Sequence, residues 1–441
     1  MKILFISLGC DKNLVDSEKM LGLLNSKGYT ITDDETEADV IVINTCCFIN
    51  DAKEESIQSI LEMAEYRKKG SCRALIVTGC LAQRYKQEIM DEIEEVDAVI
   101  GTTSYDKIAE TIEEILNGQN HFQIFEDIDR LALPEGDRLL TTGGHYAYLK
   151  IAEGCDKHCT YCIIPKVRGD YRSVPMEDLI VEAEKLAAGG VKELILVAQE
   201  TTLYGTDLYG KKSLHILIQK LCQIQGIRWI RVLYCYPEEI YDELIQTMKN
   251  ESKFCHYLDL PIQHANNQIL KRMGRRTSKE DLVQIIRTLR EEIPDIVLRT
   301  TLITGFPGET EEQHQELMDF VDEMEFNRLG VFTYSPEDGT PAARMPDQIP
   351  EETKVHRQQE LMELQQEVAF DLAENMIGKT VTAMIEGQVS GENAYVARTY
   401  GDAPGVDGYL FINTDEVMLS GDFARVKITG ACEYDLIGEL V

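Results

Sequence analysis

Apolar runs alternate with segments of helical periodicity over the first part of the chain, and this alternation limits the possible folds more than any other feature. The runs KILFISLGC at 2–10 and ADVIVINTC at 38–46 are expected to be strands, and a helical pattern follows each of them. The segment LAQRYKQEIMDEI at 81–93 is expected to form one helix. Strand–helix alternation is typical of βαβ units, whose strands run parallel in one sheet. We therefore expect an α/β protein whose N-terminal domain, residues 1–118, contains a doubly wound parallel sheet.

The rest of the chain predicts two further domains. A second strand–helix series begins near residue 145, and six βα units of this kind fit a partial (βα)6 barrel, which binds ligands at the carboxyl ends of its strands. This central domain is expected to span residues 141–375. Short strand-like runs with glycine turns at 376–441 predict a small antiparallel β-barrel. After the first strand of the central domain, later strands are expected at 193–201, 227–236, 257–263, 296–304 and 329–334.

The charge of the chain and its cysteine content narrow the class of protein. Among 441 residues there are 77 Asp and Glu against 44 Lys and Arg, a formal net charge of −33. Such a charge repels phosphate backbones and anionic membranes and attracts basic partners, although a general gain in solubility explains the composition equally well. No stretch approaches the roughly 20 apolar residues of a membrane span, and the opening lacks the pattern of a signal peptide. We therefore expect a cytoplasmic protein whose twelve cysteines serve metal binding rather than disulfides.

Three of these cysteines lie close together in GCDKHCTYC at 154–162. Cys155, Cys159 and Cys162 have C-x3-C-x2-C spacing, in the loop after the first strand of the central domain. One loop with this spacing can hold three corners of a 4Fe–4S cluster and leave the fourth iron open. The alternative is a zinc site completed by His158, but His158 directly precedes Cys159, and a side chain there would be strained in reaching the same metal.

A second set of three cysteines is spread over the N-terminal domain. Cys10, Cys46 and Cys80 each end a predicted parallel strand, and the carboxyl ends of such strands meet at one edge of a doubly wound sheet. Each strand end leads toward a helix N-terminus, whose dipole favours thiolate and cluster charge. This placement predicts a second cluster held by three thiolates. The alternative, that buried cysteines are small apolar fillers, suits the remaining six: Cys47, Cys72, Cys222, Cys235, Cys255 and Cys432.

The stretch CDKHCTYC at 155–162 resembles the signature of radical S-adenosylmethionine enzymes, with Tyr161 at its aromatic position. The resemblance implies that the open iron binds S-adenosylmethionine and that Tyr161 lies near the adenine. It also implies that Gln199 and Glu200, at the end of the second strand, meet the amino group of the cofactor. Many members have a GGE-like motif at this strand end, where this chain has AQET. The resemblance identifies no catalytic side chain, because the chemistry takes place at the clusters.

GFPGE at 305–309 is also shared with this family, and Gly305 would let the backbone approach the cofactor closely. Lys166, Arg168 and Arg172 follow the cysteine loop as a basic patch. They are either solvated loop charges or a binding site for a carboxylate of the substrate or of S-adenosylmethionine.

Two three-cysteine sets and a C-terminal barrel together resemble the methylthiotransferases over essentially the whole chain. The resemblance implies two 4Fe–4S clusters, with S-adenosylmethionine as the radical and methyl source, and replacement of a C–H bond by C–SCH3. SLGCDKNLVDSE, CTYCIIPKVRGDYRS and AQETTLYGTDLYG resemble the branch that modifies the β-carbon of an aspartate in ribosomal protein S12. The alternative within the family is methylthiolation of a transfer-RNA adenosine. Alternatives of other classes are a two-cluster electron carrier and a zinc-stabilised interaction module.

The charge of the predicted barrel bears on this choice. From residue 376 onward there are ten acidic and four basic residues, an excess of six negative charges. A module that binds RNA should carry a basic stripe and stacking aromatic residues. We therefore expect the barrel to bind a basic ribosomal protein of the small subunit, without strong nucleic-acid binding and without a membrane partner. An external electron donor is also expected for the clusters.

Overall fold

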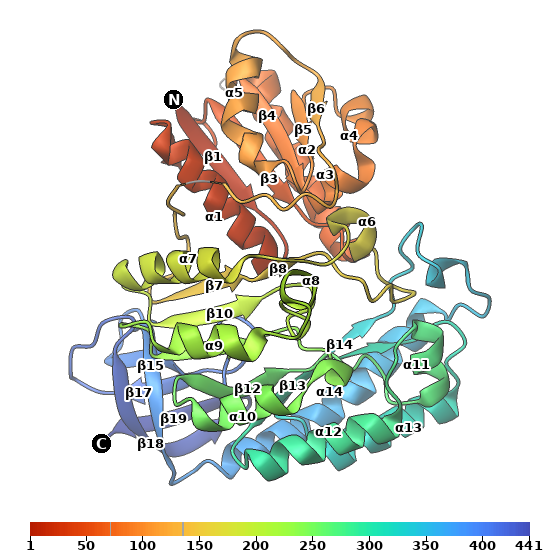
Figure 1. Ribbon diagram of the computed structural model, residues 1–441, viewed down its shortest axis with the longest axis vertical. Coiled ribbons are helices and arrows are strands. Elements are labelled where there is room, and N and C mark those ends of the chain that lie inside the picture. The colour runs from red at the N-terminus through yellow and green to blue at the C-terminus, as the bar shows by residue number, and fades with distance from the viewer. Residues whose placement is uncertain (71, 135) are drawn as a thin grey trace. The chain divides into compact units, whose positions relative to one another are not determined.

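The structure is a computed structural model that describes residues 1–70, 72–134 and 136–441 (Figure 1). The chain divides into two compact units. The first unit comprises residues 1–141, 152–174 and 337–340. The second comprises residues 142–151, 175–336 and 341–441. No helix in the described ranges is long and apolar enough to cross a membrane.

A six-stranded sheet forms the centre of the first unit. Its strand order is β2-β1-β3-β4-β5-β6 and every neighbouring pair is parallel, which confirms the predicted parallel sheet. The two short strands β2 and β6 were not expected from the sequence, and β6 adds a strand beyond residue 118. The strands are β1 (Lys2–Ser7), β2 (Thr30–Thr32), β3 (Val40–Thr45), β4 (Ala74–Gly79), β5 (Ala98–Ile100) and β6 (Phe122–Ile124).

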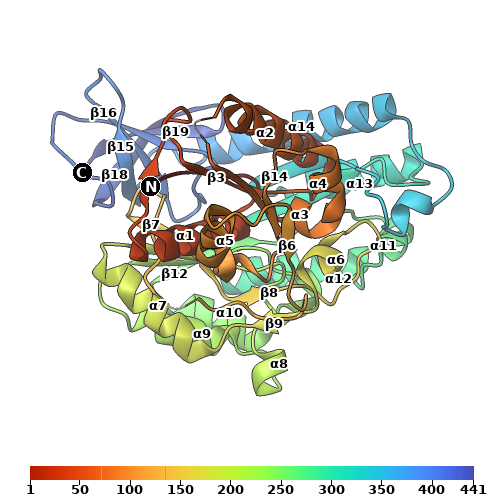
Figure 2. The same ribbon diagram turned by 90° about the horizontal axis from the view of Figure 1, so that it is seen from above.

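Helices cover both faces of this sheet, as a doubly wound fold requires. Helices α1 and α5 share one apolar core with the sheet, and α2, α3 and α4 share the other. Figure 2 shows α1 and α5 on one side of β3 and α2 and α4 on the other. The helices are α1 (Asp11–Ser26), α2 (Asn50–Lys69), α3 (Cys80–Tyr85), α4 (Gln87–Glu92), the 3-10 turn η1 (Tyr105–Lys107) and α5 (Ile108–Leu116).

The helix expected at 81–93 is interrupted at Lys86, so the prediction of one continuous helix was wrong. Lys86 has φ of +39° and ψ of −107°, which no helical residue adopts. Helix α3 therefore ends just before Lys86, and α4 begins just after it. The Lys86 ammonium lies over the ring of Phe125, 4.9 Å from its centroid, and this tertiary contact accompanies the break. A contact between distant residues of this kind leaves no trace in local periodicity.

The cysteine loop at 154–162 also belongs to the first unit. Two short antiparallel strands, β8 (Ala152–Glu153) and β9 (Arg172–Ser173), enclose the loop and the helix α6 (Ile164–Arg168) that follows it. Val167 of α6 and the preceding Ile163 are buried in the same core as α2 and α3. The loop is therefore packed against the N-terminal sheet domain.

A second parallel sheet of six strands organises the second unit. Its order is β14-β13-β12-β11-β10-β7, with all neighbours parallel, which confirms the expected partial (βα)6 architecture. The strands are β7 (Tyr146–Lys150), β10 (Glu193–Val197), β11 (Trp229–Val232), β12 (Phe254–Asp259), β13 (Val297–Thr304) and β14 (Arg328–Thr333). The helices are α7 (Met176–Ala188), α8 (Thr206–Tyr209), α9 (Leu214–Cys222), η2 (Pro237–Glu239), α10 (Asp242–Asn250), α11 (Asn267–Met273), α12 (Lys279–Glu292), α13 (Glu311–Met324), η3 (Ala342–Arg344) and α14 (Glu351–Glu374).

A closed five-stranded barrel ends the chain, in the order β15-β16-β17-β19-β18. The predicted small barrel is confirmed, and its pairs are antiparallel except for the parallel pair β17–β19. Met384 and Ala403 of the barrel pack into one apolar core with Ile195 and Trp229 of the six-stranded sheet. The barrel is therefore part of the second unit. Its strands are β15 (Thr380–Gln388), β16 (Ala394–Thr399), β17 (Leu410–Asn413), β18 (Phe423–Cys432) and β19 (Asp435–Leu440).

Candidate functional site: two sets of three cysteines

Cys10, Cys46 and Cys80 lie at the carboxyl ends of three adjacent strands of the first sheet. Cys10 follows β1 and is the N-cap of α1, Cys46 directly follows β3, and Cys80 follows β4 as the first residue of α3. Strands β1, β3 and β4 are neighbours in the sheet, so the fold brings together three residues that are far apart in the sequence. This edge is where a doubly wound sheet binds ligands.

The three thiols lie within electrostatic range of one another. Cys46 and Cys80 are buried, and Cys10 is exposed. Burial, with smaller contributions from the neighbouring Cys80 and Cys10, raises the pKa of the Cys46 thiol to about 12. Burial, and secondarily Cys10, raise the pKa of Cys80, while Arg168 opposes the rise. Thiols in this arrangement become thiolates when positive centres are present, and the irons of an iron–sulfur cluster provide such centres.

The glycines that precede Cys10 and Cys80 allow very close packing at this edge. Gly9 has φ of +88°, and a β-carbon on it would lie 2.5 Å from Cβ and 2.8 Å from Sγ of Cys46. Gly79 has φ of +92°, and a β-carbon there would collide with the backbone of Thr45. Both positions therefore require glycine for conformation and for space. The dipeptide Gly-Cys in SLGC and VTGC is a signal that sequence analysis had available and did not use.

A buried polar network surrounds these cysteines. Asn13 Nδ2 donates hydrogen bonds to the carbonyl oxygens of Leu8 at 3.0 Å and Thr45 at 2.9 Å, which ties α1 to two of the strand ends. Arg168 of α6 donates from Nε to Cys80 Sγ at 3.2 Å. The remaining guanidinium nitrogens of Arg168 bind Asp16, Glu153 and Asn13. Sequence analysis missed this network, because its members come from four separate segments.

The partners of Arg168 change the interpretation of the basic patch. Arg168 is only 2% exposed, and its carboxylate partners are Asp16 and Glu153 of this chain. Arg168 is therefore not a solvated loop charge, and the carboxylates that it binds in this structure belong to the chain itself. Lys166 donates to the carbonyl oxygen of Gly339 at 2.6 Å, and Arg172 pairs with Asp129 at 3.3 Å.

The second set of cysteines lies in the loop between β8 and α6. Cys155 and Cys159 are buried and Cys162 is partly buried. Burial raises the pKa of the Cys162 thiol, and the neighbouring Cys159 and Cys155 add to the effect. The loop is held by backbone hydrogen bonds from Cys155 to Gly169 at 3.2 Å and from Cys162 to Cys159 at 3.0 Å. These three thiols therefore also lie in one small region.

His158 differs from the cysteines around it. Its side chain is exposed, whereas Cys155 and Cys159 on either side are buried, and its backbone has φ of +50°. Over the described ranges, no group of three or more His, Cys, Asp and Glu side chains is arranged to hold a single metal ion. A 4Fe–4S cluster makes a different demand, because each cysteine binds a separate iron at its own corner. Both cysteine sets offer the soft thiolate ligands that such a cluster takes.

The four residues expected near S-adenosylmethionine have different local surroundings. Tyr161 and Gln199 are partly exposed, whereas Glu200 is buried and its Oε1 accepts a hydrogen bond from the Thr202 amide at 2.8 Å. Gly305 has φ of +68°, and the side chain of Lys354 fills the space where its β-carbon would stand. Packing against Lys354 by itself accounts for glycine at this position.

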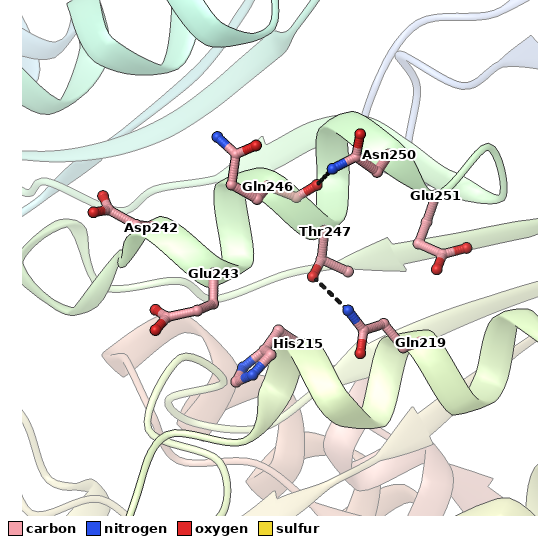
Figure 3. A pocket seen from close by; sticks show the side chains of 8 residues that line it. All are labelled: His215, Gln219, Asp242, Glu243, Gln246, Thr247, Asn250 and Glu251. Atoms are coloured by element: carbon pink, nitrogen blue, oxygen red, sulfur yellow. Dashed lines mark hydrogen bonds between the residues drawn. The ribbon is translucent and has the colours of Figure 1, made fainter.

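A groove of about 370 Å³ lies between α9 and α10 of the second unit (Figure 3). Gln219 of α9 donates to Thr247 of α10 at 3.2 Å across it. None of the cysteines and none of the four residues expected near the cofactor lines this groove. It is lined by His215, Gln219, Asp242, Glu243, Gln246, Thr247, Asn250 and Glu251.

Three family models match successive parts of the chain. Residues 2–101 match "Uncharacterized protein family UPF0004", residues 149–321 match the radical SAM superfamily, and residues 377–441 match the TRAM domain. Two solved structures show a similar fold at low sequence identity. The radical S-adenosylmethionine methyltransferase TsrM from Kitasatospora setae is 13% identical, with a TM-score of 0.57 over 77% of this chain and 73% of that one. The cobalamin-dependent S-adenosylmethionine radical enzyme OxsB is 12% identical, with a TM-score of 0.51 over 82% of this chain and 56% of that one.

Curated relatives match along their full length. The ribosomal protein uS12 methylthiotransferase RimO of Lachnoclostridium phytofermentans is 64% identical over 99% of both chains. Its counterpart in Clostridioides difficile is 50% identical over 100% of this chain and 99% of the relative. That of Clostridium perfringens is 50% identical over 99% of this chain and 97% of the relative.

Proposed function

Because the chain belongs to the family of ribosomal protein uS12 methylthiotransferases, we propose that it replaces a C–H bond of a uS12 aspartate, at the β-carbon, with C–SCH3. The full-length relatives confirm the resemblance to radical S-adenosylmethionine methylthiotransferases that was expected from the sequence. The observation that carries the proposal furthest is the placement of both cysteine sets in one compact unit. This reaction needs two reactive centres, and the first unit supplies a ligand set for each.

The matched families imply 4Fe–4S clusters and S-adenosylmethionine as cofactors. We assign Cys155, Cys159 and Cys162 to one cluster and the three cysteines of the N-terminal sheet to an auxiliary cluster. When bound, these groups supply electron transfer, hydrogen abstraction and the methyl group, and the auxiliary cluster holds or relays the sulfur. The chain itself positions the thiolates, withholds water from the buried ones and offers an open iron at each cluster. The auxiliary ligands are Cys10, Cys46 and Cys80.

Residues that contact S-adenosylmethionine are part of the same proposal. Tyr161 neighbours Cys162 in the cluster loop, which supports its assignment to the adenine. Gln199 and Glu200 follow the end of β10, the side of a (βα) barrel where ligands bind. The Thr202 amide holds the Glu200 carboxylate as an acceptor, which suits the amino group of the cofactor. Gly305 follows the end of β13, where its backbone is the proposed contact.

The surface of the barrel supports a basic protein as partner. Three of its ten acidic residues form internal ion pairs. Glu386 binds Arg398, and Asp402 binds Arg328. Asp407 lies 3.5 Å from Arg299. The exposed charges remain acidic in balance, which favours a basic ribosomal protein over RNA or an anionic membrane. The exposed acidic residues are Glu392, Asp415, Glu416, Asp422, Glu433 and Glu439, against Lys379, Arg425 and Lys427. An external electron donor and a cytoplasmic location, where ribosomal proteins are found, complete the proposal.

The proposal is tested by the intact mass of uS12 from a strain that lacks this gene. We expect uS12 from this strain to carry a hydrogen in place of one methylthio group and to be lighter by that difference, and the wild-type gene to restore the mass. A variant with Cys10, Cys46 and Cys80 all changed to Ala should fail to restore the mass while still cleaving S-adenosylmethionine to deoxyadenosine. The matched control is Cys432→Ala, an exposed barrel cysteine, which should restore the mass fully. An unchanged uS12 with loss of a methylthiolated transfer-RNA nucleoside would overturn the assignment in favour of the RNA branch.

A further inference from the structure

Arg168 occupies a position that links the two cysteine sets. It is the last residue of α6, and α6 begins two residues after Cys162 of the cluster loop. Its Nε donates a hydrogen bond to Sγ of Cys80, which belongs to the other set, at 3.2 Å. One side chain therefore reaches from the loop of one proposed cluster to a ligand of the other.

The guanidinium is held in a single orientation by three groups on two elements, α1 and β8. Its Nη1 binds Asp16 of α1 at 2.7 Å and Glu153 of β8 at 3.2 Å, and its Nη2 binds the Asn13 side-chain oxygen. Arginine donates from nitrogens in a rigid planar fork, so fixing Nη1 and Nη2 also fixes the direction of Nε. With the side chain 2% exposed, water competes little for these bonds.

We infer that Arg168 is a positioning residue of the auxiliary cluster, which orients the Cys80 thiolate and raises the reduction potential of that cluster. This inference rests on the proposed ligand set of Cys10, Cys46 and Cys80. Reduction adds negative charge to a cluster, and a hydrogen bond and a positive charge at a ligand sulfur stabilise that charge. Asp16 and Glu153 partly neutralise the guanidinium, so they set how much positive charge Cys80 experiences.

The test is a reduction potential measured on the full-length protein. Cys155, Cys159 and Cys162 are changed to Ala in every sample, so that the signal comes from the auxiliary cluster alone. Redox titration followed by electron paramagnetic resonance gives the midpoint potential. Arg168→Met should lower the potential, because both the hydrogen bond and the charge are lost. Arg168→Lys keeps the charge but not the planar fork, and its potential should lie between those of Arg168→Met and the unchanged residue.

Asp16→Asn provides a test of opposite sign. The amide is nearly the same size as the carboxylate, but it removes one negative charge beside the guanidinium, so the potential should rise. If the network had a purely structural role, Arg168→Met and Asp16→Asn would both only loosen the site, and their potentials would not shift in opposite directions. The matched control is Arg130→Met, which breaks a guanidinium–carboxylate pair with Asp106 elsewhere in the same unit and should leave the potential unchanged.

The outcomes separate this inference from the proposed function. Opposite shifts for Arg168→Met and Asp16→Asn support the inference. If Arg168→Met does not assemble the cluster, then Arg168→Lys and Asp16→Asn decide, and potentials equal to that of the Arg130→Met control would overturn it. If the sample with unchanged Arg168 holds no cluster at all, the proposed ligand set fails, and the inference fails with it.

Discussion

Glycine before a cysteine is the residue-scale feature that best explains how the proposed auxiliary site is built. At Gly9 the chain turns with a positive φ, and the Cys46 side chain occupies the space that any larger residue would need. The same strand-end turn brings Cys10 toward Cys46. Gly28 separates the requirement of conformation from that of space. Its φ is also positive, at +82°, but nothing lies within 4 Å of a β-carbon placed there.

Gly9→Ala should therefore cost more than the strain of its backbone. A non-glycine residue at positive φ costs about 1–2 kcal/mol, and Gly28→Ala should lower the free energy of unfolding by about that amount. Gly9→Ala should lower the free energy of unfolding further. It should also lose the iron of the proposed auxiliary cluster while retaining the iron of the proposed cluster at Cys155, Cys159 and Cys162. Iron analysis and chemical denaturation of anaerobically purified protein measure both quantities. Equal iron content and equal stability of the two variants would contradict this account of the site.

At the scale of elements, α6 shows how tertiary packing creates structure that has little stability of its own. A helix of five residues is far below the length that is stable alone in water. Pro165 in its first turn and Gly169 after its end define its limits. Val167 is 1% exposed in the core of the first unit, and its carbonyl oxygen accepts a hydrogen bond from Thr102 Oγ1 at 2.8 Å. The core therefore holds the helix that carries Arg168.

Val167→Ala should loosen this attachment. Removing two buried methyl groups from a packed core lowers the free energy of unfolding by roughly 1–3 kcal/mol. The same substitution at Val181 of α7, which is 52% exposed, should change it by less than about 0.5 kcal/mol. Thermal or chemical denaturation of the two variants gives the comparison. If Val167→Ala lowered the free energy of unfolding no more than Val181→Ala does, α6 would not be anchored by this core.

At the scale of the whole molecule, buried charges join the barrel to the six-stranded sheet of the second unit. Arg398 of β16 binds Glu193 of β10 and Glu386 of β15, each at 2.7 Å, and is fully buried. Glu193 also accepts from Arg231 of β11 at 2.8 Å. His145, just before β7, lies 3.0 Å from Glu386. Since breaking one partner of a buried pair leaves an uncompensated charge, this junction specifies where the barrel attaches.

The junction should make stability depend on pH. Burial disfavours the charged form of His145, but the hydrogen bond and the charge of Glu386 outweigh burial and the nearby Arg398, so the pKa is raised. Because the pKa of His145 is higher in the folded state than in the unfolded state, its ionised form stabilises the fold. This stabilisation is complete at pH values below the unfolded pKa of about 6.5, and it is lost as the pH rises through the folded pKa. The pKa of Glu386 is lowered against the effect of burial, by His145 and Arg398, so its contribution is lost only toward acid pH.

His145→Gln should therefore destabilise the protein more at pH 5.5 than at pH 8, as measured by chemical denaturation at both values. His256→Gln serves as the control, because His256 pairs with the exposed Asp295 at 2.7 Å and exposed pairs contribute little. A destabilisation by His145→Gln that is the same at both pH values would show that its ionised form contributes nothing at this junction.

The amino-acid sequence by itself determined the two parallel sheets, the closed barrel and the positions of Cys10, Cys46 and Cys80 at strand ends. These follow from local alternation of apolar and polar residues over many positions. The three-residue strands β2 and β6 are too short to show such alternation, and the break at Lys86 accompanies a contact with Phe125. Only the tertiary structure decided that Arg168 binds Cys80 and that Glu386 serves a buried pair. A hydrogen bond depends on the distance between groups that the fold brings together, and charge counted along a chain does not contain that distance.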